Sequence, residues 1–277
     1  MPIRVAALTA AALLGFAGNS ILCRAALRGG LIDPAAFTAI RLGAGAVVLS
    51  LVARASPWKR RDLPSALALF AYALPFSLAY LKLDAGTGAL VLFGAVQFSM
   101  LAWSLVRGDR PGAPVWLGGA LAFGGLVALV LPGLSAPPLP YAALMAAAGV
   151  AWAVYSLRGR GATEPIAANA SNFTFACVPA ALAVPLESLH TSTHGALLAV
   201  ASGAITSGLG YSLWYAVLPR LSRAKAAVVQ LCVPPLAAVL GVVLFEEQTS
   251  MRLAICGAVI LGGVALATAT AARPSRR

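Results

Sequence analysis

Ten long apolar runs follow one another along this sequence, with short polar joints between them. A helix needs about 20 mostly apolar residues to cross the hydrocarbon core of a bilayer. Only 10% of the 277 residues are charged and 60% are apolar, whereas soluble domains carry about 25% charged residues. The sequence therefore predicts an all-α integral membrane protein with ten transmembrane helices. The predicted spans are 5–23, 36–53, 64–82, 86–106, 114–131, 140–157, 165–186, 196–218, 224–245 and 251–271.

The net charge of +12 is distributed unevenly over the joints. If the N-terminus is cytoplasmic, fifteen lysines and arginines fall on the cytoplasmic side, and only Arg24, Arg28, Lys82 and Arg252 fall on the other. Cytoplasmic loops of membrane proteins carry such an excess of positive charge. The distribution predicts a multi-pass protein of the cell's inner (cytoplasmic) membrane, in contact with its lipids and with both termini in the cytoplasm. It also explains the basicity without nucleic-acid binding.

Two stretches with one small-residue skeleton, GALAFGG at 119–125 and GAVILGG at 257–263, lie 138 positions apart. The same offset aligns Asp109 with Glu247, each in the joint before the matching span. Each half then holds five spans, and because five is odd the second half enters the membrane from the opposite side. The first run follows Arg4 as in a signal peptide, but its cleavage would destroy this inverted repeat. The predicted units are a first repeat at 1–131, a linker at 132–139, a second repeat at 140–271 and a basic cytoplasmic tail at 272–277.

Inverted repeats are common in secondary transporters, which bind substrate near the middle of the membrane between the halves. Four stretches strengthen this interpretation: LLGFAGNSILC, FTAIRLGAGAVVL, GDRPGAPVWLGGALAFGGLVAL, and LWYAVLPRLSRAKAAVVQLCVPPLAAVLGVVLFEEQTSMRLAICGAVILGGVALA. With them, nearly the whole chain resembles the drug/metabolite transporter (DMT) superfamily, specifically the ten-helix transporters with two EamA-type domains. The resemblance implies transport of small organic molecules such as amino acids, other metabolites or drug-like compounds, often by export. The sequence has no ATP-binding motif, so we expect a gradient to drive transport and no cofactor to be needed.

Prolines mark positions where helices can bend. Pro234 and Pro235 lie inside the predicted ninth span, whereas Val96–Gln97 stands at the matching place of the fourth, a departure from the family pattern. We therefore expect a proline kink only in the ninth of these two helices. Pro75 and Pro179 also lie inside spans, and each proline frees backbone carbonyls there. The four prolines are candidate hinges or gates, with fixed kinks as the alternative.

Polar side chains inside the spans are few, and such groups tend to face a cavity or a partner. Gln97 stands near the middle of span four, and Asn169 and Asn172 share one face of span seven. Gln97 and Asn172 either line a substrate pathway or join helices by hydrogen bonds. For Asn19, toward the outer end of span one, we favour the structural role.

Arg41 is the only basic residue inside a predicted span. It lies about 8 Å from the outer end of that span at a rise of about 1.5 Å per residue. Its long side chain can snorkel to the membrane surface as an anchor, which is the interpretation that we favour. The alternative is that its guanidinium group pairs with a substrate carboxylate in a fork geometry.

Tyr72 and Tyr211 lie near the middle of helices three and eight, 139 positions apart and thus nearly equivalent in the repeat. Because a tyrosine hydroxyl needs a partner in lipid, we expect both to approach a shared central cavity. Flat or cationic groups of a substrate can stack there. We expect the substrate to contact helices three, four, seven, eight and nine.

Five tryptophans fall near the predicted cytoplasmic ends, where tryptophan usually forms an interfacial belt. Trp152 and Tyr155 share one helix face, and Tyr211, Trp214 and Tyr215 share another. The belt is the default interpretation for the tryptophans. The alternative is that these two aromatic sets line the substrate pathway.

Other functional classes have less support. A membrane enzyme needs a nucleophile with a base, or a metal cluster, inside the bilayer, yet both histidines lie in one outer loop and all acids lie in joints or at span ends. We expect neither an enzyme nor a metal site, although a membrane-embedded enzyme or a scaffold stays the alternative. Proton antiport through a central carboxylate is likewise unsupported, which leaves Glu246 or Glu247 as the only plausible coupling acids. The choices between exporter and exchanger, and between monomer and homodimer, stay open.

Overall fold

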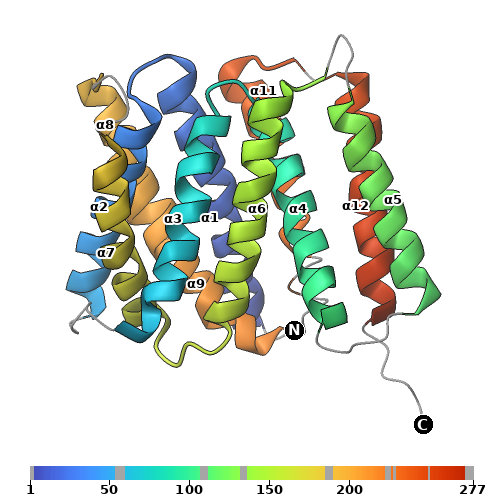
Figure 1. The fold of residues 1–277 in the computed structure, drawn as a ribbon, viewed down its shortest axis with the longest axis horizontal. Coiled ribbons are helices and arrows are strands. Elements are labelled where there is room, and N and C mark those ends of the chain that lie inside the picture. Colours follow the sequence, from blue (N-terminus) through green and yellow to red (C-terminus); the bar gives the residue numbers. More distant parts are fainter. Residues whose placement is uncertain are drawn as a thin grey trace.

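The computed structural model describes residues 3–53, 60–106, 112–131, 136–184, 190–221, 226, 229–248 and 250–271. These residues form a bundle of helices that run alternately up and down along one axis (Figure 1). The first half contains α1 (Ile3–Arg28), α2 (Pro34–Ala53), η1 (Arg60–Asp62), α3 (Leu63–Ala79), α4 (Ala85–Val106) and α5 (Ala113–Val130). The second half contains α6 (Leu139–Gly159), α7 (Pro165–Ala183), α8 (Thr193–Ala201), η3 (Ser202–Leu209), α9 (Gly210–Val217), η4 (Leu218–Arg220), α11 (Val233–Phe245) and α12 (Met251–Ala271).

Six of the described helical segments are long and apolar enough to cross a membrane, and α3, α5, α11 and α12 contain shorter apolar helices. Together they account for the ten predicted helical spans, since α8, η3 and α9 form one continuous rod. α1 begins and α12 ends at the same end of the bundle (Figure 1), which we call the terminal end. The opposite end, where α1 joins α2, α3 joins α4 and α11 joins α12, is the distal end. The all-helical membrane fold predicted from the apolar runs is confirmed.

The ninth span differs from its prediction. α11 begins only at Val233, and Pro234 and Pro235 stand in its first turn. The first helical turn tolerates proline because its backbone N–H groups have no partner inside the helix. Residues 226, 229 and 230 before it are also helical and 231–232 form a turn, so the two prolines stand at a break in the predicted ninth span, while Pro75 and Pro179 lie inside α3 and α7.

The eighth span contains a segment that the sequence analysis did not predict. η3 is a π-helix between α8 and α9. In a π-helix, backbone hydrogen bonds connect residues five positions apart. This form is rare in proteins overall, but where it occurs it is often at a functional site. η3 packs closely on α2: a Cβ atom added to Gly203 would collide with the backbone carbonyl oxygen of Arg41. The glycine is needed for this close approach.

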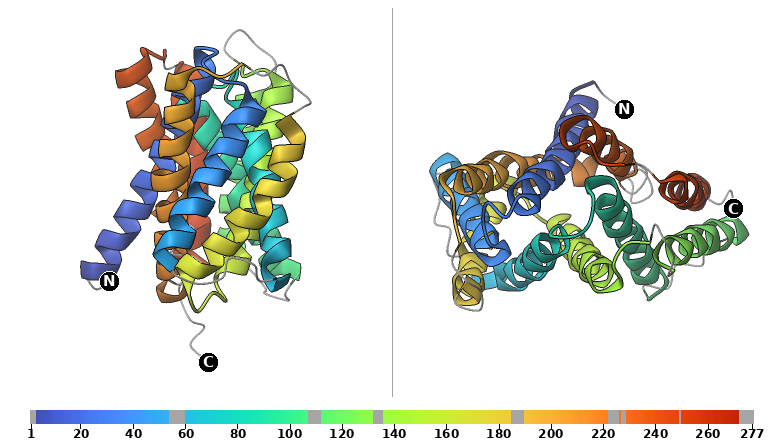
Figure 2. Two further views of the ribbon diagram at one scale, coloured as in Figure 1. Left: turned by 90° about the vertical axis from the view of Figure 1, so that its left-hand side faces the viewer. Right: turned by 90° about the horizontal axis from the view of Figure 1, so that it is seen from above.

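Small residues also bring other helices together. α5 and α12 pack on each other at one edge of the bundle (Figures 1 and 2). A Cβ atom added to Gly263 would lie 2.6 Å from the carbonyl oxygen of Gly118, as expected if the second GAxxxGG stretch serves helix packing. Buried side chains come from α1, α2, α3, α4, α6, α7, η3 and α9, among other elements.

Candidate functional site

Two buried tyrosines, one from each half of the chain, meet at the centre of the bundle. The hydroxyl oxygens of Tyr72 in α3 and Tyr211 in α9 are 3.0 Å apart. The exposed fractions of these residues are 3% and 1%, and their rings lie edge to face with centroids 6.3 Å apart. Both tyrosines therefore lie inside the protein and against one another, as their mid-span positions predict.

Arg41 of α2 reaches the same place. Its Nη2 donates to the hydroxyl oxygens of Tyr211 at 2.6 Å and Tyr72 at 3.3 Å, and its Nε donates to Oγ of Ser207 at 2.8 Å. The guanidinium group also lies 5.4 and 5.2 Å from the ring centroids of Tyr72 and Phe76. Arg41 is fully buried, so the favoured interpretation of a snorkelling anchor is wrong. The side chain turns inward because hydroxyl groups and ring faces there replace the contacts that water would supply.

One nitrogen of this guanidinium group is unsatisfied. Nη1 of Arg41 is buried and makes no hydrogen bond. The ion pairs formed among the described residues involve other arginines, Arg24 and Arg61. Neutral groups alone therefore hold the charge of Arg41, although buried charges in proteins are normally paired.

Asn19 of α1 connects these groups. Its Nδ2 donates to the hydroxyls of Tyr72 at 3.1 Å and Tyr211 at 3.5 Å. Its Oδ1 accepts from Oγ of Ser202 at 2.8 Å and Ser207 at 3.1 Å, two serines that stand five positions apart in η3. These bonds do join helices, but the sequence analysis did not place Asn19 at the centre, although it is the only amide in the first span. We call Asn19, Arg41, Tyr72, Ser202, Ser207 and Tyr211 the central cluster.

A small cavity borders the central cluster. Its volume is about 10 Å³, which is room for about one water molecule. The ring of Phe16 closes it from α1, with its centroid 5.3 Å from that of Trp152 and 5.8 Å from that of Tyr211. The centre is therefore closed to larger molecules in this conformation. The aromatic part of the wall consists of Phe16, Tyr72, Phe76, Phe93, Trp152 and Tyr211.

A larger pocket of about 440 Å³ lies at the terminal end. Its wall carries charges of both signs, from Arg61, Asp62, Arg158 and Glu164, and includes the buried residues Asn172 and Tyr215.

Aromatic and amide groups connect the terminal pocket to the centre. The hydroxyl of Tyr215 donates to the carbonyl oxygen of Tyr155 at 3.1 Å. The hydroxyl of Tyr155 donates to Oδ1 of Asn169 at 2.5 Å and accepts from Nδ2 of Asn172 at 3.3 Å. The ring of Tyr155 lies 5.6 Å from that of Trp152 and 6.3 Å from that of Tyr211. The predicted aromatic sets thus form one continuous series.

Two tryptophans depart from the belt interpretation. Trp152 and Trp214 have exposed fractions of 2% and 0%, so the belt interpretation is wrong for both. They turn inward because their rings pack edge to face on Phe16 at the centre. Trp103 and Trp116 are exposed, as a belt requires, and Trp58 lies outside the described residues.

Gln97 does not join the central cluster. It is 8% exposed and lies on α4 about one turn beyond Phe93, which does border the central cavity. Pro75, by contrast, follows Tyr72 within the same helix by three positions. Of the predicted residues, the structure thus brings together Arg41, Tyr72 and Tyr211, and leaves Gln97 outside.

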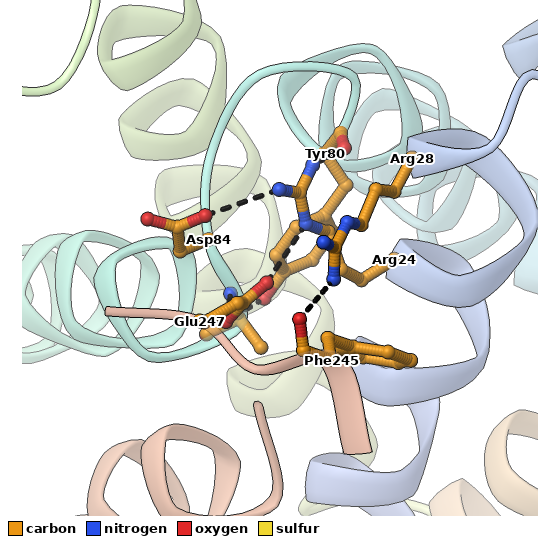
Figure 3. A network of polar contacts seen from close by, with 7 residues as sticks. Arg24, Arg28, Tyr80, Asp84, Phe245 and Glu247 are labelled. Atoms are coloured by element: carbon orange, nitrogen blue, oxygen red, sulfur yellow. Dashed lines mark hydrogen bonds and ion pairs between the residues drawn. The ribbon is translucent and has the colours of Figure 1, made fainter. Parts of the chain in front are cut away.

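A second cluster closes the distal end, where Arg24 lies between two acids (Figure 3). Its Nε lies 2.9 Å from Oε1 of Glu247 and its Nη2 lies 3.0 Å from Oδ1 of Asp84, while Nη1 donates to the carbonyl oxygen of Tyr80 at 3.1 Å. Oε2 of Glu247 accepts from the backbone N–H of Ala85 at 2.9 Å. These bonds fasten α1 to the α3–α4 and α11–α12 joints. We call Arg24, Asp84 and Glu247 the distal cluster.

The backbone after α11 places Glu247 in this cluster. Glu246 has a positive φ of 54°, the left-handed conformation that often ends a helix. The chain reverses there, and Glu247 turns into the bundle with a side chain that is only 7% exposed. The sequence marks Glu247 as a possible coupling acid but does not reveal its partner. That partner, Arg24, lies 223 positions earlier in the chain.

Comparisons with known proteins agree with this architecture. The sequence model of the EamA-like transporter family matches residues 139–269. An uncharacterized protein of Pseudomonas aeruginosa is 49% identical over 269 residues, which cover 95% of this chain and 94% of that protein. A probable terminal-alkyne amino-acid exporter of Streptantibioticus cattleyicolor is 28% identical over 244 residues, covering 82% of this chain and 81% of that protein.

A known crystal structure has the same fold, with a TM-score of 0.70, 22% identity and coverage of 98% of this chain and 99% of that one. The family match and the relatives confirm the resemblance drawn from the sequence stretches, and they point to no enzyme family. This chain therefore belongs to the EamA-like transporter family of the drug/metabolite transporters, and it is a multi-pass membrane protein that carries a small-molecule substrate.

Proposed function

We propose that this protein is a secondary transporter that exports or exchanges small organic metabolites, such as amino acids or drug-like compounds, across the cytoplasmic membrane by alternating access. The observation that carries the proposal is the central cluster. Asn19, Arg41 and Tyr72 come from the first half of the chain, and Ser207 and Tyr211 from the second. Polar and charged groups at this depth are costly and mark substrate pathways.

Helix packing supports the two inverted repeats, 1–131 and 140–271. α1 begins at the terminal end and α6 at the distal end (Figure 1), so the halves run through the bundle in opposite senses. α1 packs on α9 and α11 as α6 packs on α3 and α4, and both α2 with α7 and α5 with α12 pair a helix with its counterpart. A central site between such halves can open to one side and then to the other.

The two ends of the bundle differ in a way that fits one state of this cycle. We assign the terminal end to the cytoplasm on the basis of the charge bias. The distal cluster then closes the outer end, and the terminal pocket of about 440 Å³ faces the cytoplasm. With a central cavity of about 10 Å³, this conformation is inward-facing with a contracted centre.

The route from the terminal pocket to the centre defines the proposed substrate path. It leads past Asn172 and Tyr215 in the pocket wall, then past Tyr155, Trp152 and Trp214 to the central cluster. Gln97 stays outside this path in the inward-facing state. The segments proposed to bend during opening are η3 and the proline positions of α3, α7 and α11, with Pro75 next to the centre.

Two observations bear on direction and coupling. The relative from Streptantibioticus cattleyicolor is named a probable amino-acid exporter, which supports export and makes amino acids the first substrates to test. None of the central cluster residues carries a carboxylate. Exchange or facilitated movement therefore fits better than proton antiport through a central acid.

Counterflow in liposomes tests the function. Purified protein is reconstituted into liposomes that are loaded with one unlabelled amino acid, and uptake of the same labelled amino acid is followed with and without a pH gradient. We expect uptake above that of protein-free liposomes for at least one amino acid, without need of the gradient. The proposal fails if a broad panel of amino acids and other metabolites shows no counterflow.

Replacing Tyr211 with Phe is expected to weaken substrate binding. The substitution keeps the ring but removes the hydroxyl that lies 2.6 Å from Nη2 of Arg41. When a substrate enters the centre, this hydroxyl can donate a hydrogen bond to it. A hydrogen bond to a charged group contributes about 1.5–3 kcal/mol, so the KM of counterflow should rise about tenfold or more. Tyr141→Phe, the same change in the first turn of α6, is the control. Equal KM values for the two variants would contradict a central role for Tyr211.

A further inference from the structure

We propose that the central cluster binds a carboxylate group of the substrate and that Arg41 forms the ion pair. The inference rests on the proposed transport function, because it names the chemical class of the solute. It predicts that organic carboxylates with an apolar or flat body are carried, and that the corresponding amides, which lack the carboxylate charge, are not.

The two buried arginines, Arg24 and Arg41, differ in their partners. The three bonded nitrogens of Arg24 contact two carboxylates and a backbone carbonyl. Within the part of the chain that the structure describes, Arg41 contacts hydroxyl groups and ring faces, and its Nη1 is buried without a partner. Burying a charge without an opposite charge is costly. The partner of Arg24 is thus built into the chain, whereas that of Arg41 comes from outside.

The groups around Arg41 offer hydrogen-bond donors. Asn19 turns its Nδ2 toward the two tyrosine hydroxyls and uses its Oδ1 to accept from Ser202 and Ser207. The hydroxyls of Tyr72 and Tyr211 bond to each other, which uses only one of their two protons. The other proton and Nη1 of Arg41 are available to an anion that enters between them.

The planar guanidinium group of Arg41 selects the shape of the anion. Nη1 and Nη2 of a guanidinium group form a planar pair of donors that matches the two oxygens of a carboxylate. One oxygen binds the free Nη1, and the other takes the place of a tyrosine oxygen on Nη2. A tetrahedral phosphate carries more oxygens and more charge than this single arginine can satisfy. The geometry therefore favours a carboxylate.

The wall of the central cavity indicates what the carboxylate is attached to. Phe16, Phe93 and Trp152 border the cavity beside Asn19 and Tyr72. Aromatic rings favour apolar and flat groups. Because the rings occupy the space now, with about 10 Å³ left, a ligand must separate them, and the fluorescence of Trp152 and Trp214 should change when it binds.

Ligand pairs that differ only in charge test the inference. Full-length protein in detergent is titrated with phenylalanine and 3-phenylpropionate, and with their primary amides, while tryptophan fluorescence and the unfolding temperature are recorded. We expect both carboxylates to bind at least tenfold more tightly than their amides. In Arg41→Gln this preference for carboxylates should disappear, and in Arg41→Lys it should persist with weaker binding. Arg4→Gln, a change at an exposed residue in the first turn of α1, is the control and should leave the preference unchanged.

Each result decides the inference. If the amides bind as tightly as the acids, if inorganic phosphate binds as tightly as the acids, if no carboxylate binds, or if Arg41→Gln keeps the preference, Arg41 is not a carboxylate site. The comparison of acids with amides on the unaltered protein holds even if Arg41→Gln does not fold. Counterflow of neutral solutes without any preference for carboxylates would overturn this inference and leave the transport function standing. Binding of carboxylates without counterflow of any solute would support this inference and overturn the transport function.

Discussion

In a Glu247→Gln variant, the distal end of the bundle is expected to open, and the thiol of Cys23 should react with a membrane-impermeant reagent about ten times faster. The substitution removes the charge that lies 2.9 Å from Nε of Arg24. Arg24 then keeps only Asp84, whose side chain is 48% exposed. Removing one partner of a fully buried ion pair costs about 3–5 kcal/mol, and less here because Asp84 remains. A shift of about 1.4 kcal/mol already changes a conformational equilibrium tenfold.

Cys23 is a suitable reporter for this opening. It precedes Arg24 in α1 and is fully buried in the present conformation. The other three cysteines, Cys177, Cys232 and Cys256, are replaced by alanine, and labelling is measured in proteoliposomes. The unfolding temperature is recorded in parallel, so that opening of the distal end is distinguished from general unfolding.

Glu246→Gln is the matched control. Glu246 is the neighbouring acid, it is exposed, and its substitution changes the net charge by the same amount without touching Arg24. Labelling of Cys23 should stay at the rate of the parent protein. If the two glutamine variants label Cys23 equally fast, the distal cluster is a surface ion pair and does not gate the outer end.

The spans were predictable because the thickness of the bilayer sets the length of an apolar helix. The breaks inside these helical spans were not predictable from the sequence. The run at 224–245 is apolar on both sides of Pro234 and Pro235, so hydropathy does not record that α11 begins only at Val233. In η3, the residues SGAITSGL are as compatible with an α-helix as with the observed π-helix. The choice depends on packing against α2, which is a tertiary contact.

The same distinction holds for the candidate site. The positions of Tyr72 and Tyr211 in the middle of matching spans were enough to predict that both approach a shared central cavity, which both of them line. The direction of Arg41 was not predictable, because its depth in the membrane is the same whether the side chain snorkels or turns inward. Its hydrogen-bond partners come from α3, η3 and α9, and only the folded bundle brings these elements to α2.

Gly203→Ala is expected to lower the unfolding temperature and to abolish ligand binding by Arg41. The added methyl group would collide with the backbone carbonyl oxygen of Arg41, which cannot swing aside as a side chain can. α2 and η3 must then separate, and overpacking of this kind costs about 1–3 kcal/mol. The separation also moves Ser207 of η3 away from Arg41. In the present structure, Nε of Arg41 donates a hydrogen bond to Oγ of Ser207 at 2.8 Å.

Gly43→Ala provides the control on the partner helix. Gly43 lies two positions after Arg41 in α2, and a Cβ atom added there would meet nothing within 4 Å. Alanine is the better helix former by about 1 kcal/mol, so this variant should unfold at the same or a higher temperature. The response to ligand then separates two explanations. If Gly203→Ala merely loosens the bundle, carboxylates will still raise the unfolding temperature of this variant. If the contact of η3 with α2 holds Arg41 in its binding position, carboxylates will not raise the unfolding temperature of Gly203→Ala. They will still raise that of Gly43→Ala.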